Sequence, residues 1–428
     1  MRPIVLILFF LLGACTSEVS TQTPDSPDSG ADASQGDVGP ADMPTEGDMT
    51  EVEDSGADSS QDTDMTADMP QEPQPRAIGP RPVDPTPLAQ GTIFAAPDGS
   101  GQDCTQDTPC DVWEALEQAE AGDVVFLRGG EYAIDRNLNF RGRGATPRAI
   151  FESYPGEEAI LDGSALGPED DIYIRVLGDP VAIRLLTIRN MPKGGISVRT
   201  SDNLLEGLKI HDNLLSGIHI HESYETPVSN RNIIRDSVIW GNSGAGLMTA
   251  EYADGGNSDG ISISSGIGNR VENCLVYGNS DDGIDVWRST DAYVGYSIIH
   301  SSGIASGNGQ GVKAGGAPPS ARAFVEHNIS YNNKSAGFDF NSGVGVTFRH
   351  NTSWGNSRGF WFGDDTLSEL NLAFEDATHG GGGQQNQNSW QLDGTPTPLN
   401  TDPASSDFLL PAEPAFSTLG AHAGRTVE

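Results

Sequence analysis

The sequence predicts an all-β chain wound into a right-handed parallel β-helix, a solenoid whose coils each contribute three short strands, with a short N-terminal capping helix. Three observations lead to this fold. Short apolar runs rich in β-branched residues alternate with glycine-rich turns through most of the chain. An asparagine ends one run of each unit, and a glycine opens the next apolar triplet. Between Asn333 and Asn356 the unit repeats after 23 residues, a length suited to three short strands and three turns.

The repeat unit pairs each asparagine with a glycine a few residues later. Copies occur as Asn213 with Gly217, Asn279 with Gly283, Asn333 with Gly337, and Asn356 with Gly359. We interpret the asparagines as an internal ladder in which each side chain bonds the backbone of a neighbouring coil, because plain turn propensity does not explain their regular spacing to the glycine. A leucine-rich or hexapeptide solenoid is the competing architecture, but neither the leucine-rich consensus nor a hexapeptide period is visible.

Segments on both sides of the repeat are expected to close its ends. Apolar residues at helical spacing within 111–119 predict the capping helix. The residues after about 366 lose the repeat and are expected to cover the open end of the stack. Cys104 and Cys110, set among Gly, Asp, Thr and Pro, suit a small loop closed by a disulfide, whereas Cys274 lies in an apolar pattern and is expected to be a buried thiol.

The N-terminus predicts export and anchoring. Residues 1–14 have the basic, apolar and small-residue zones of a signal peptide. The string Leu12-Gly13-Ala14-Cys15 resembles a bacterial lipobox, which implies that Cys15 becomes a lipidated first residue, and Thr16 after it implies the outer membrane, facing the periplasm or the cell surface. Residues 15–90 are expected to be a disordered acidic linker, because they hold too few apolar side chains to form a core. Residues 91–428 then form the β-helix domain.

The charge of the chain restricts its partners. The formal net charge is -37 and the isoelectric point is about 4.3. Nucleic acid is therefore excluded as a partner, and an acidic polymer would need a bridging cation. We expect a monomer.

Aligning the coils on their glycines brings acidic residues together. Equivalent residues of successive coils lie about 4.8 Å apart. Asp259 and Asp282 each precede a repeat glycine, and Asp281 and Asp285 flank the second of them. Neighbouring carboxylates repel each other unless a cation lies between them, and Ca²⁺ accepts about six to eight oxygen ligands in loose geometry. The sequence therefore predicts a calcium site.

The same alignment places a lysine beside this cluster. Lys313 follows Asp285 by one coil and is surrounded by small residues. A nearby cation and burial would favour its neutral form, so that it can act as a general base. Extra residues in 243–259 and 303–310 belong to the same coils, and insertions on one face are expected to form a binding cleft.

The motifs around these residues resemble polysaccharide lyase family 9, the pectate-lyase-like β-helices. They are Asn257-Ser258-Asp259-Gly260, Asp281-Asp282-Gly283-Ile284-Asp285 and Gln310-Gly311-Val312-Lys313, within a likeness that covers about 195–362. The resemblance implies that the four aspartates bind calcium and that Lys313 is the base. Where the family often has an aromatic residue and a lysine after Asp259-Gly260, this chain has Ile261-Ser262, which leaves the sugar contacts open.

The resemblance implies β-elimination on a uronate polymer. Lys313 would remove the proton next to the uronate carboxylate, and calcium would neutralise the developing charge. Pectate is the expected acidic polysaccharide, with alginate or a glycosaminoglycan-like polymer as alternatives. Candidate substrate contacts are Trp287, Arg288, Arg322 and Lys334.

Two other classes of function fit the same residues. One is a non-catalytic uronate-binding or structural surface β-helix that calcium stabilises. The other is a metal-dependent hydrolase. A hydrolase that uses two facing carboxylates has no need of a lysine, so Lys313 argues against that mechanism.

Overall fold

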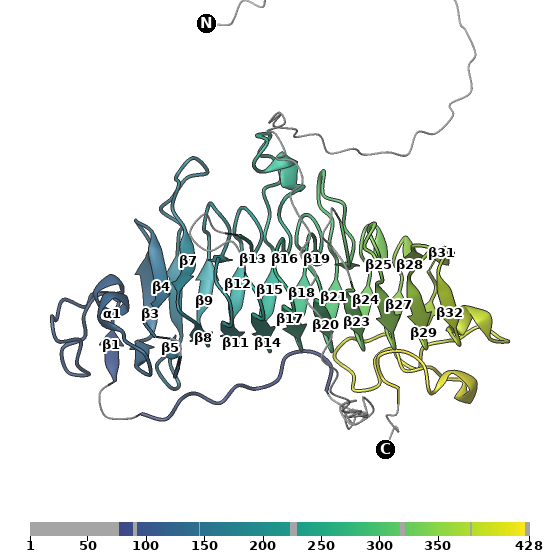
Figure 1. The fold of residues 1–428 in the computed structure, drawn as a ribbon, viewed down its shortest axis with the longest axis horizontal. Coiled ribbons are helices and arrows are strands. Elements are labelled where there is room, and N and C mark those ends of the chain that lie inside the picture. Colours follow the sequence, from purple (N-terminus) through teal and green to yellow (C-terminus); the bar gives the residue numbers. More distant parts are fainter. Residues whose placement is uncertain are drawn as a thin grey trace, which may run out of the picture. The chain divides into compact units, whose positions relative to one another are not determined.

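The computed structural model describes six stretches of the chain, residues 77–88, 92–144, 146–222, 229–316, 322–376 and 379–423. The predicted signal peptide, Cys15 and the linker up to residue 76 lie outside them. Within them the predicted fold class is confirmed, because short parallel strands wind into a three-sided β-helix (Figure 1). No helix in the described stretches is both long and apolar enough to cross a membrane.

Three parallel sheets form the wall, and successive strands of the chain pass from sheet A to sheet B to sheet C. The twelve strands of sheet A are β1 (Ile93–Ala95), β2 (Val124–Leu127), β5 (Ala149–Ser153), β8 (Val181–Arg184), β11 (Leu204–Glu206), β14 (Ile233–Arg235), β17 (Arg270–Glu272), β20 (Tyr293–Gly295), β23 (Phe324–Glu326), β26 (Thr347–Arg349), β29 (Leu367–Glu369) and β32 (Gln384–Asn386).

Sheets B and C have ten strands each. The strands of sheet B are β3 (Gly130–Ala133), β6 (Ala159–Asp162), β9 (Thr187–Arg189), β12 (Lys209–His211), β15 (Val238–Trp240), β18 (Leu275–Tyr277), β21 (Ile298–His300), β24 (Ile329–Tyr331), β27 (Thr352–Trp354) and β30 (Leu372–Phe374). Those of sheet C are β4 (Leu138–Gly142), β7 (Ile174–Gly178), β10 (Ile196–Val198), β13 (Ile218–Ile220), β16 (Ile261–Ile263), β19 (Ile284–Val286), β22 (Val312–Lys313), β25 (Ala336–Asp339), β28 (Arg358–Phe362) and β31 (His379–Gly381).

Alternate residues of each strand point inward, and the equivalent inward residues of successive coils stack into columns. These apolar columns fill the interior. In sheet C, the inward side chains of Ile218, Ile261, Ile284 and Val312 have no exposed surface. The residues that alternate with these inward side chains along each strand face outward. Strict alternation over such short strands therefore separates a packed core from a polar outer face.

The predicted asparagine ladder is present at the turns. The backbone N–H of Asn213 donates to Oδ1 of Asn242 at 3.2 Å, and that of Asn242 donates to Oδ1 of Asn279 at 3.1 Å. All three side chains are fully buried. Each amide satisfies backbone groups that the turns would otherwise bury without a partner, which fixes the stacking of successive coils.

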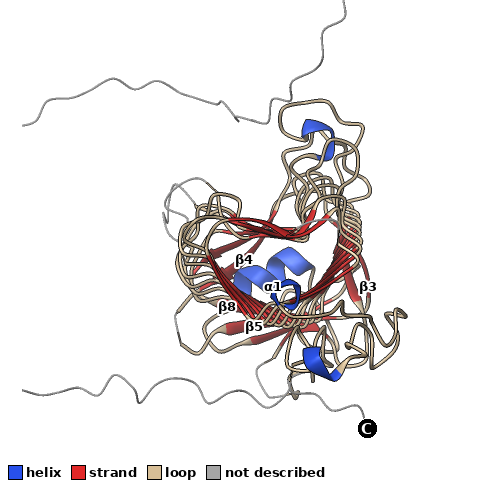
Figure 2. Cartoon of the chain, turned by 90° about the vertical axis from the view of Figure 1, so that its right-hand side faces the viewer, coloured by secondary structure: helices blue, strands red, loops and turns tan. Residues whose placement is uncertain are grey.

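Helix α1 (Val112–Gln118) closes the N-terminal end, as predicted. Oδ1 of the N-cap residue Asp111 accepts a hydrogen bond from the N–H of Glu114 at 2.8 Å. Ala115 and Leu116 are buried, and the helix packs against β1, β2 and β4. Viewed along the β-helix, α1 lies within the outline of the sheets (Figure 2).

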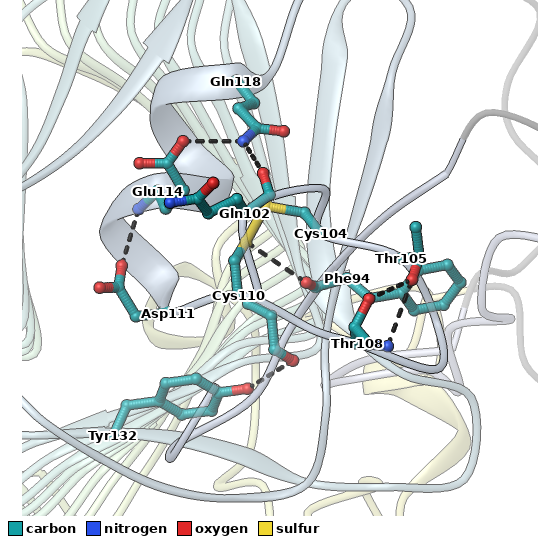
Figure 3. The surroundings of a disulfide bond; sticks show 11 residues. Phe94, Gln102, Cys104, Thr105, Thr108, Cys110, Asp111, Glu114, Gln118 and Tyr132 are labelled. Carbon is teal, nitrogen blue, oxygen red and sulfur yellow. Dashed lines mark hydrogen bonds between the residues drawn. A yellow bond between two sulfur atoms is a disulfide. The ribbon is translucent and has the colours of Figure 1, made fainter. Parts of the chain in front are cut away.

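The predicted disulfide joins Cys104 to Cys110 immediately before α1 (Figure 3). The N–H of Phe94 donates to the carbonyl of Cys104 at 2.8 Å, and the N–H of Cys110 donates to the carbonyl of Phe94 at 3.1 Å. The disulfide loop is thereby fastened to β1. Cys274 is free and fully buried, as the apolar pattern around it predicts.

The structure corrects the predicted domain boundary at residue 90, because residues 77–88 lie against the turns between sheets A and B. We call this stretch the strap. Gly79 donates its N–H to the carbonyl of Tyr296 at 2.7 Å, and Arg81 donates from Nε to Oδ1 of Asp236 at 2.7 Å. The strap is rich in proline and lacks a core of its own, but hydrogen bonds and ion pairs with distant coils hold it in place.

The residues after β32 cover the open end only in part. Helix η2 (Ser389–Gln391) stacks the Trp390 ring on that of His379, with centroids 4.4 Å apart, and this contact closes the last coil. The rest, including η3 (Pro414–Phe416), packs Phe408 and its apolar neighbours on the outer face of sheet B. The C-terminal segment therefore serves mainly as a cover for one sheet.

Candidate active site

The predicted site lies on the outer face of sheet C, where one outward residue of each strand stands beside the next. We call this row the sheet C column. In register it reads Arg175, Ser197, His219, Ser262, Asp285, Lys313, Asp339 and Trp361. The alignment of the coils on their glycines is confirmed at every outward position from His219 to Trp361.

Asp259 and Asp282 come from the turns that lead into β16 and β19. A glycine must follow Asp282, because a Cβ on Gly283 would lie 2.3 Å from Cγ2 of Ile299. The two turns stack directly, and the backbone N–H of Asp282 donates to Oδ1 of Asp259 at 3.2 Å. The close packing of the turns therefore fixes the positions of both carboxylates.

Three of the four predicted aspartates meet. One carboxylate oxygen from each of Asp259, Asp282 and Asp285 lies within 4.8 Å of the others, and all three residues are buried. We call them the aspartate cluster. Asp281 lies outside this group, because its Oδ1 accepts the N–H of Asn308 at 2.6 Å on the loop side of the turn.

Lys313 is the one cation that contacts the aspartate cluster among the described residues. Its Nζ lies 3.1 Å from Oδ2 of Asp282 and 3.1 Å from Oδ2 of Asp285, and it donates a hydrogen bond to the latter. Burial alone lowers the pKa of Lys313, but the charges of the nearby aspartates outweigh burial and raise it above its ordinary value. The aspartates by themselves thus hold the lysine protonated, and the neutral form expected from the sequence depends on a cation bound between them.

The aspartates themselves are hard to ionise together. Burial, followed by the charge of Asp282, raises the pKa of Asp259 to about 6 and that of Asp281 to about 9. Burial also raises the pKa of Asp282, and it raises the pKa of Asp285 well above its ordinary value. The site therefore carries more buried negative charge than one ammonium balances.

The donor atoms of the aspartate cluster fit a hard cation. Oδ1 of Asp285 is buried with no hydrogen-bond partner among the described residues, and Oδ2 of Asp282 is buried with only the Lys313 ammonium beside it, at 3.1 Å. A buried carboxylate oxygen without a donor is costly, and an all-oxygen set of this kind is what Ca²⁺ binds. The unpartnered oxygen of Asp285 thus supports the predicted metal site on structural grounds.

The two predicted insertions stand beside the aspartate cluster. The first contains η1 (Ala253–Gly255) and projects on the sheet C side (Figure 1). It is anchored by Tyr252, which is buried and donates its hydroxyl to the carbonyl of Pro168 at 2.6 Å. The second insertion contacts the first, because Ser306 donates from Oγ to Oδ2 of Asp254 at 2.9 Å. The expected clustering of insertions on one face is confirmed.

Lys334, a predicted substrate contact, is engaged by the second insertion. Its Nζ donates to the carbonyl of Ala305 at 3.0 Å and to that of Gly307 at 2.8 Å. The neighbouring residue Asn308 contacts Asp281. Lys334 therefore braces the loop behind the aspartates.

The other predicted substrate contacts differ in position. Trp287 follows β19, is 37% exposed and lies beside the Arg288 guanidinium, 5.4 Å from the ring centroid. Both are close to the aspartate cluster along the chain. Arg322 pairs with Asp291 through two bonds of 2.6 and 2.7 Å on an exposed turn at the edge of sheet A. The structure thus leaves Trp287 and Arg288 beside the site, whereas Arg322 is bound elsewhere.

Gln310 is a site residue that the sequence analysis did not single out. Its backbone N–H donates to Oδ1 of Asp282 at 2.8 Å, and its own Oε1 is buried without a partner. The signal was present in the sequence, because Gln310 precedes Gly311 just as Asp282 precedes Gly283.

Comparison with known proteins agrees with this geometry. The family model described as Pel9A-like, right handed beta helix region matches residues 93–380. Pectate lyase L of Paenibacillus polymyxa is 27% identical over 364 residues, which are 78% of this chain and 79% of the relative. Pectate lyase PEL9 of Emericella nidulans is 27% identical over 323 residues, 63% of this chain and 75% of the relative.

Solved structures show the same fold. The crystal structure of pectate lyase Pel9A matches with a TM-score of 0.63 at 22% identity, over 73% of this chain and 83% of that chain. A rhamnogalacturonan lyase matches with a TM-score of 0.61 at 20% identity, over 78% of this chain and 100% of that chain.

Fold, site and relatives define a class of protein, the parallel β-helix polysaccharide lyases. Within that class, the chain belongs to the Pel9A-like right-handed β-helix family. The family and enzyme class inferred from the aspartate and lysine motifs are thereby confirmed.

Proposed function

We propose that the protein cleaves a uronate-containing polysaccharide, with pectate as the first candidate, by calcium-dependent β-elimination in which Lys313 is the base. The observation that carries the proposal is the Lys313 ammonium 3.1 Å from both Asp282 and Asp285, on an outward face that also buries Oδ1 of Asp285 without a donor among the described residues. The two curated relatives named as pectate lyases support pectate as the polymer.

Calcium would be held by Asp259, Asp282 and Asp285, with Asp281 at the edge of the site. When bound, it supplies positive charge that stabilises the negative charge developing on the substrate carboxylate. Neutralised aspartates no longer retain the proton on Lys313, so the pKa of the lysine falls toward the range in which it accepts a proton.

Lys313 then removes the proton from C5 of the uronate, the carbon next to the carboxylate. The electron pair of the C5–H bond forms a double bond between C4 and C5. The glycosidic C4–O bond breaks, and the departing oxygen keeps the bonding pair and takes up a proton. The product is a chain with an unsaturated uronate end, which absorbs ultraviolet light.

The proposal is tested by following ultraviolet absorbance with a panel of uronate polymers, with calcium and with chelator. We expect calcium-dependent product from the wild type and a loss of about 10³-fold in Lys313→Ala. Lys209→Ala is the matched control, because Lys209 is exposed on sheet B and pairs with Glu158. Equal activity in the two variants would rule out Lys313 as the base.

A second candidate is a non-catalytic uronate-binding or structural β-helix that calcium stabilises, favoured by the absence of the family's lysine after Asp259-Gly260. Tight calcium binding with no product from any polymer would establish this candidate in place of the lyase.

We also propose that Cys15 carries a lipid that anchors the protein in the outer membrane, on the support of the lipobox-like string that it ends. Cys15→Ser is expected to move the protein from the membrane fraction to the soluble fraction without changing its lyase activity. Retention of the variant in the membrane fraction would contradict the anchor.

A further inference from the structure

The sheet C column continues beyond the aspartate cluster toward the N-terminus, and its chemistry changes from acidic to basic. Ser262, His219, Ser197 and Arg175 follow Asp285 in register. Coils are about 4.8 Å apart, so Arg175 stands about 19 Å from Asp285 along the β-helix. Arg199 lies two residues after Ser197 and so on the same side of its strand.

Arg175 and Arg199 are held close to each other. Both guanidinium groups lie by the Tyr173 ring, at 4.3 Å for Arg175 and 5.7 Å for Arg199. Arg199 also donates from Nε to Oγ of Ser197 at 3.0 Å. Because the two like charges lie close together in a partly buried place, burial and the charge of Arg175 lower the pKa of Arg199.

Arg175 lacks the carboxylate partner that most described arginines have. In this acidic chain, ion pairs are formed by Arg81, Arg128, Arg136, Arg143, Arg184, Arg189, Arg231, Arg235, Arg270, Arg322 and Arg349. Arg175 forms no ion pair with a described residue, and its Nε is buried without a hydrogen-bond partner. A buried N–H of a cation without an acceptor is costly, and an anionic ligand would supply the acceptor.

The floor between the arginines and the aspartate cluster is polar and uncharged. His219 and His221 stack with centroids 4.3 Å apart, and they contact the hydroxyls of Ser264 at 2.9 Å and Ser197 at 2.7 Å. Burial lowers the pKa of His219 to about 3 and that of His221 to about 4, so both are neutral at neutral pH. They offer hydrogen bonds to sugar hydroxyls without adding charge.

We propose that Arg175 and Arg199 form a carboxylate-binding subsite that grips a second uronate of the polymer, several coils from the aspartate cluster. This subsite rests on the proposed function for its ligand class. A guanidinium group binds a carboxylate through two parallel hydrogen bonds, and two such groups on a rigid sheet select an acidic sugar over a neutral one. The enzyme would thus engage one chain at two points, by a cation at the aspartates and by guanidinium groups at the subsite.

The test measures equilibrium binding of an oligouronate to Lys313→Ala in chelator, so that neither turnover nor calcium contributes. Replacing Arg175 and Arg199 together by glutamine is expected to weaken binding about tenfold or more. Arg231→Gln is the matched control, because it removes a charge from an exposed turn that pairs with Asp202. The methyl-esterified oligomer should bind all three proteins equally weakly.

Three outcomes would overturn the subsite: equal binding by the double variant and the control, the same loss with the esterified oligomer, or no binding by the protein that retains both arginines. Lysine replacements at the two positions provide a second variant that keeps the charge but not the paired donors, and intermediate binding is expected from it. Thermal unfolding checks that each variant is folded. Failure of the lyase proposal is distinguishable, because it removes ultraviolet product in calcium whatever the affinity in chelator.

Discussion

Sheets A and C both bury carboxylates, but they treat the charge differently. On sheet A, Arg184 bonds Glu152 at 2.6 Å and Glu206 at 2.7 Å, and Arg235 donates to Glu206 at 2.6 Å. Thr86 of the strap adds two further hydrogen bonds to Glu152. On sheet C, the aspartate cluster shares a single ammonium and leaves Oδ1 of Asp285 without a donor among the described residues.

This difference in charge compensation distinguishes the structural scaffold on sheet A from the candidate site on sheet C. The carboxylates of Glu152 and Glu206 on sheet A are both paired with arginines of the same chain, and we call this group the sheet A cluster. The sheet A cluster can therefore stabilise the fold without having any further role. The aspartate cluster is costly to bury, and the Lys313 ammonium compensates its charge only in part, so a bound cation would lower that cost. Buried negative charge that the protein does not fully compensate therefore indicates a functional face better than burial or the number of carboxylates does.

The largest effect on stability is expected from breaking the sheet A cluster. Arg184→Ala leaves Glu152 fully buried without its main cation, and this should lower the free energy of unfolding by about 3 kcal/mol. Urea unfolding measures the loss, and lyase activity per folded molecule should not change. Arg231→Ala removes an exposed arginine and should leave stability unchanged; an equally small effect of Arg184→Ala would show that the sheet A cluster does not stabilise the fold.

Bound calcium should compensate the buried carboxylate charges on sheet C, as arginine compensates those on sheet A. At about 100 times its dissociation constant, a ligand that binds only the folded state stabilises it by about 2.7 kcal/mol. Asp282→Asn should lose most of this gain and yet be more stable than wild type in chelator, because it removes one of the repelling charges. Thermal unfolding with calcium and with chelator measures both effects, and an unchanged calcium shift in the variant would place the metal elsewhere.

The sequence predicted which of these residues lie side by side because this face is repetitive. Asp259 and Asp282 occupy equivalent positions in successive coils, and so do Asp285 and Lys313, so an alignment on the glycines brings them together without knowledge of the turns. The asparagine ladder was predictable for the same reason. A repeat converts spacing in the sequence into proximity in space.

Features that depend on single pairs of residues could not be predicted in this way. The strap is held by contacts such as Arg81 with Asp236, which recur in no other coil, and its composition is that of a linker. The strength with which the aspartates hold the proton on Lys313 was not predictable either, because the balance between burial and four carboxylates depends on distances that spacing does not give. The position of Asp281 depends likewise on the local direction of one side chain.

Asp376 offers a third kind of buried carboxylate, one for which the described residues provide neither an arginine partner nor a cation site. It occupies the asparagine position of the last rung of the ladder, where its Oδ1 accepts the N–H of Asn356 at 2.9 Å and its Oδ2 is buried without a partner. Burial raises its pKa to about 7. The carboxyl therefore holds its proton more tightly in the folded state than in the unfolded state, where its pKa is near 4.

The raised pKa of Asp376 gives a pH-dependent prediction with a definite sign. Its contribution to stability is fully present below about pH 4 and is lost as the pH rises through about 7. Asp376→Asn keeps an uncharged side chain at every pH, so it should match wild type at pH 4 and be clearly more stable than wild type at pH 8, where the wild-type carboxyl is ionised in the folded state. Urea unfolding of both proteins at several pH values isolates this difference from the titration of the aspartate cluster, which the two proteins share. A difference in stability that stays constant with pH would mean that Asp376 is ionised throughout this range. The asparagine ladder would then tolerate a buried negative charge without the arginine partners that such charges have on sheet A.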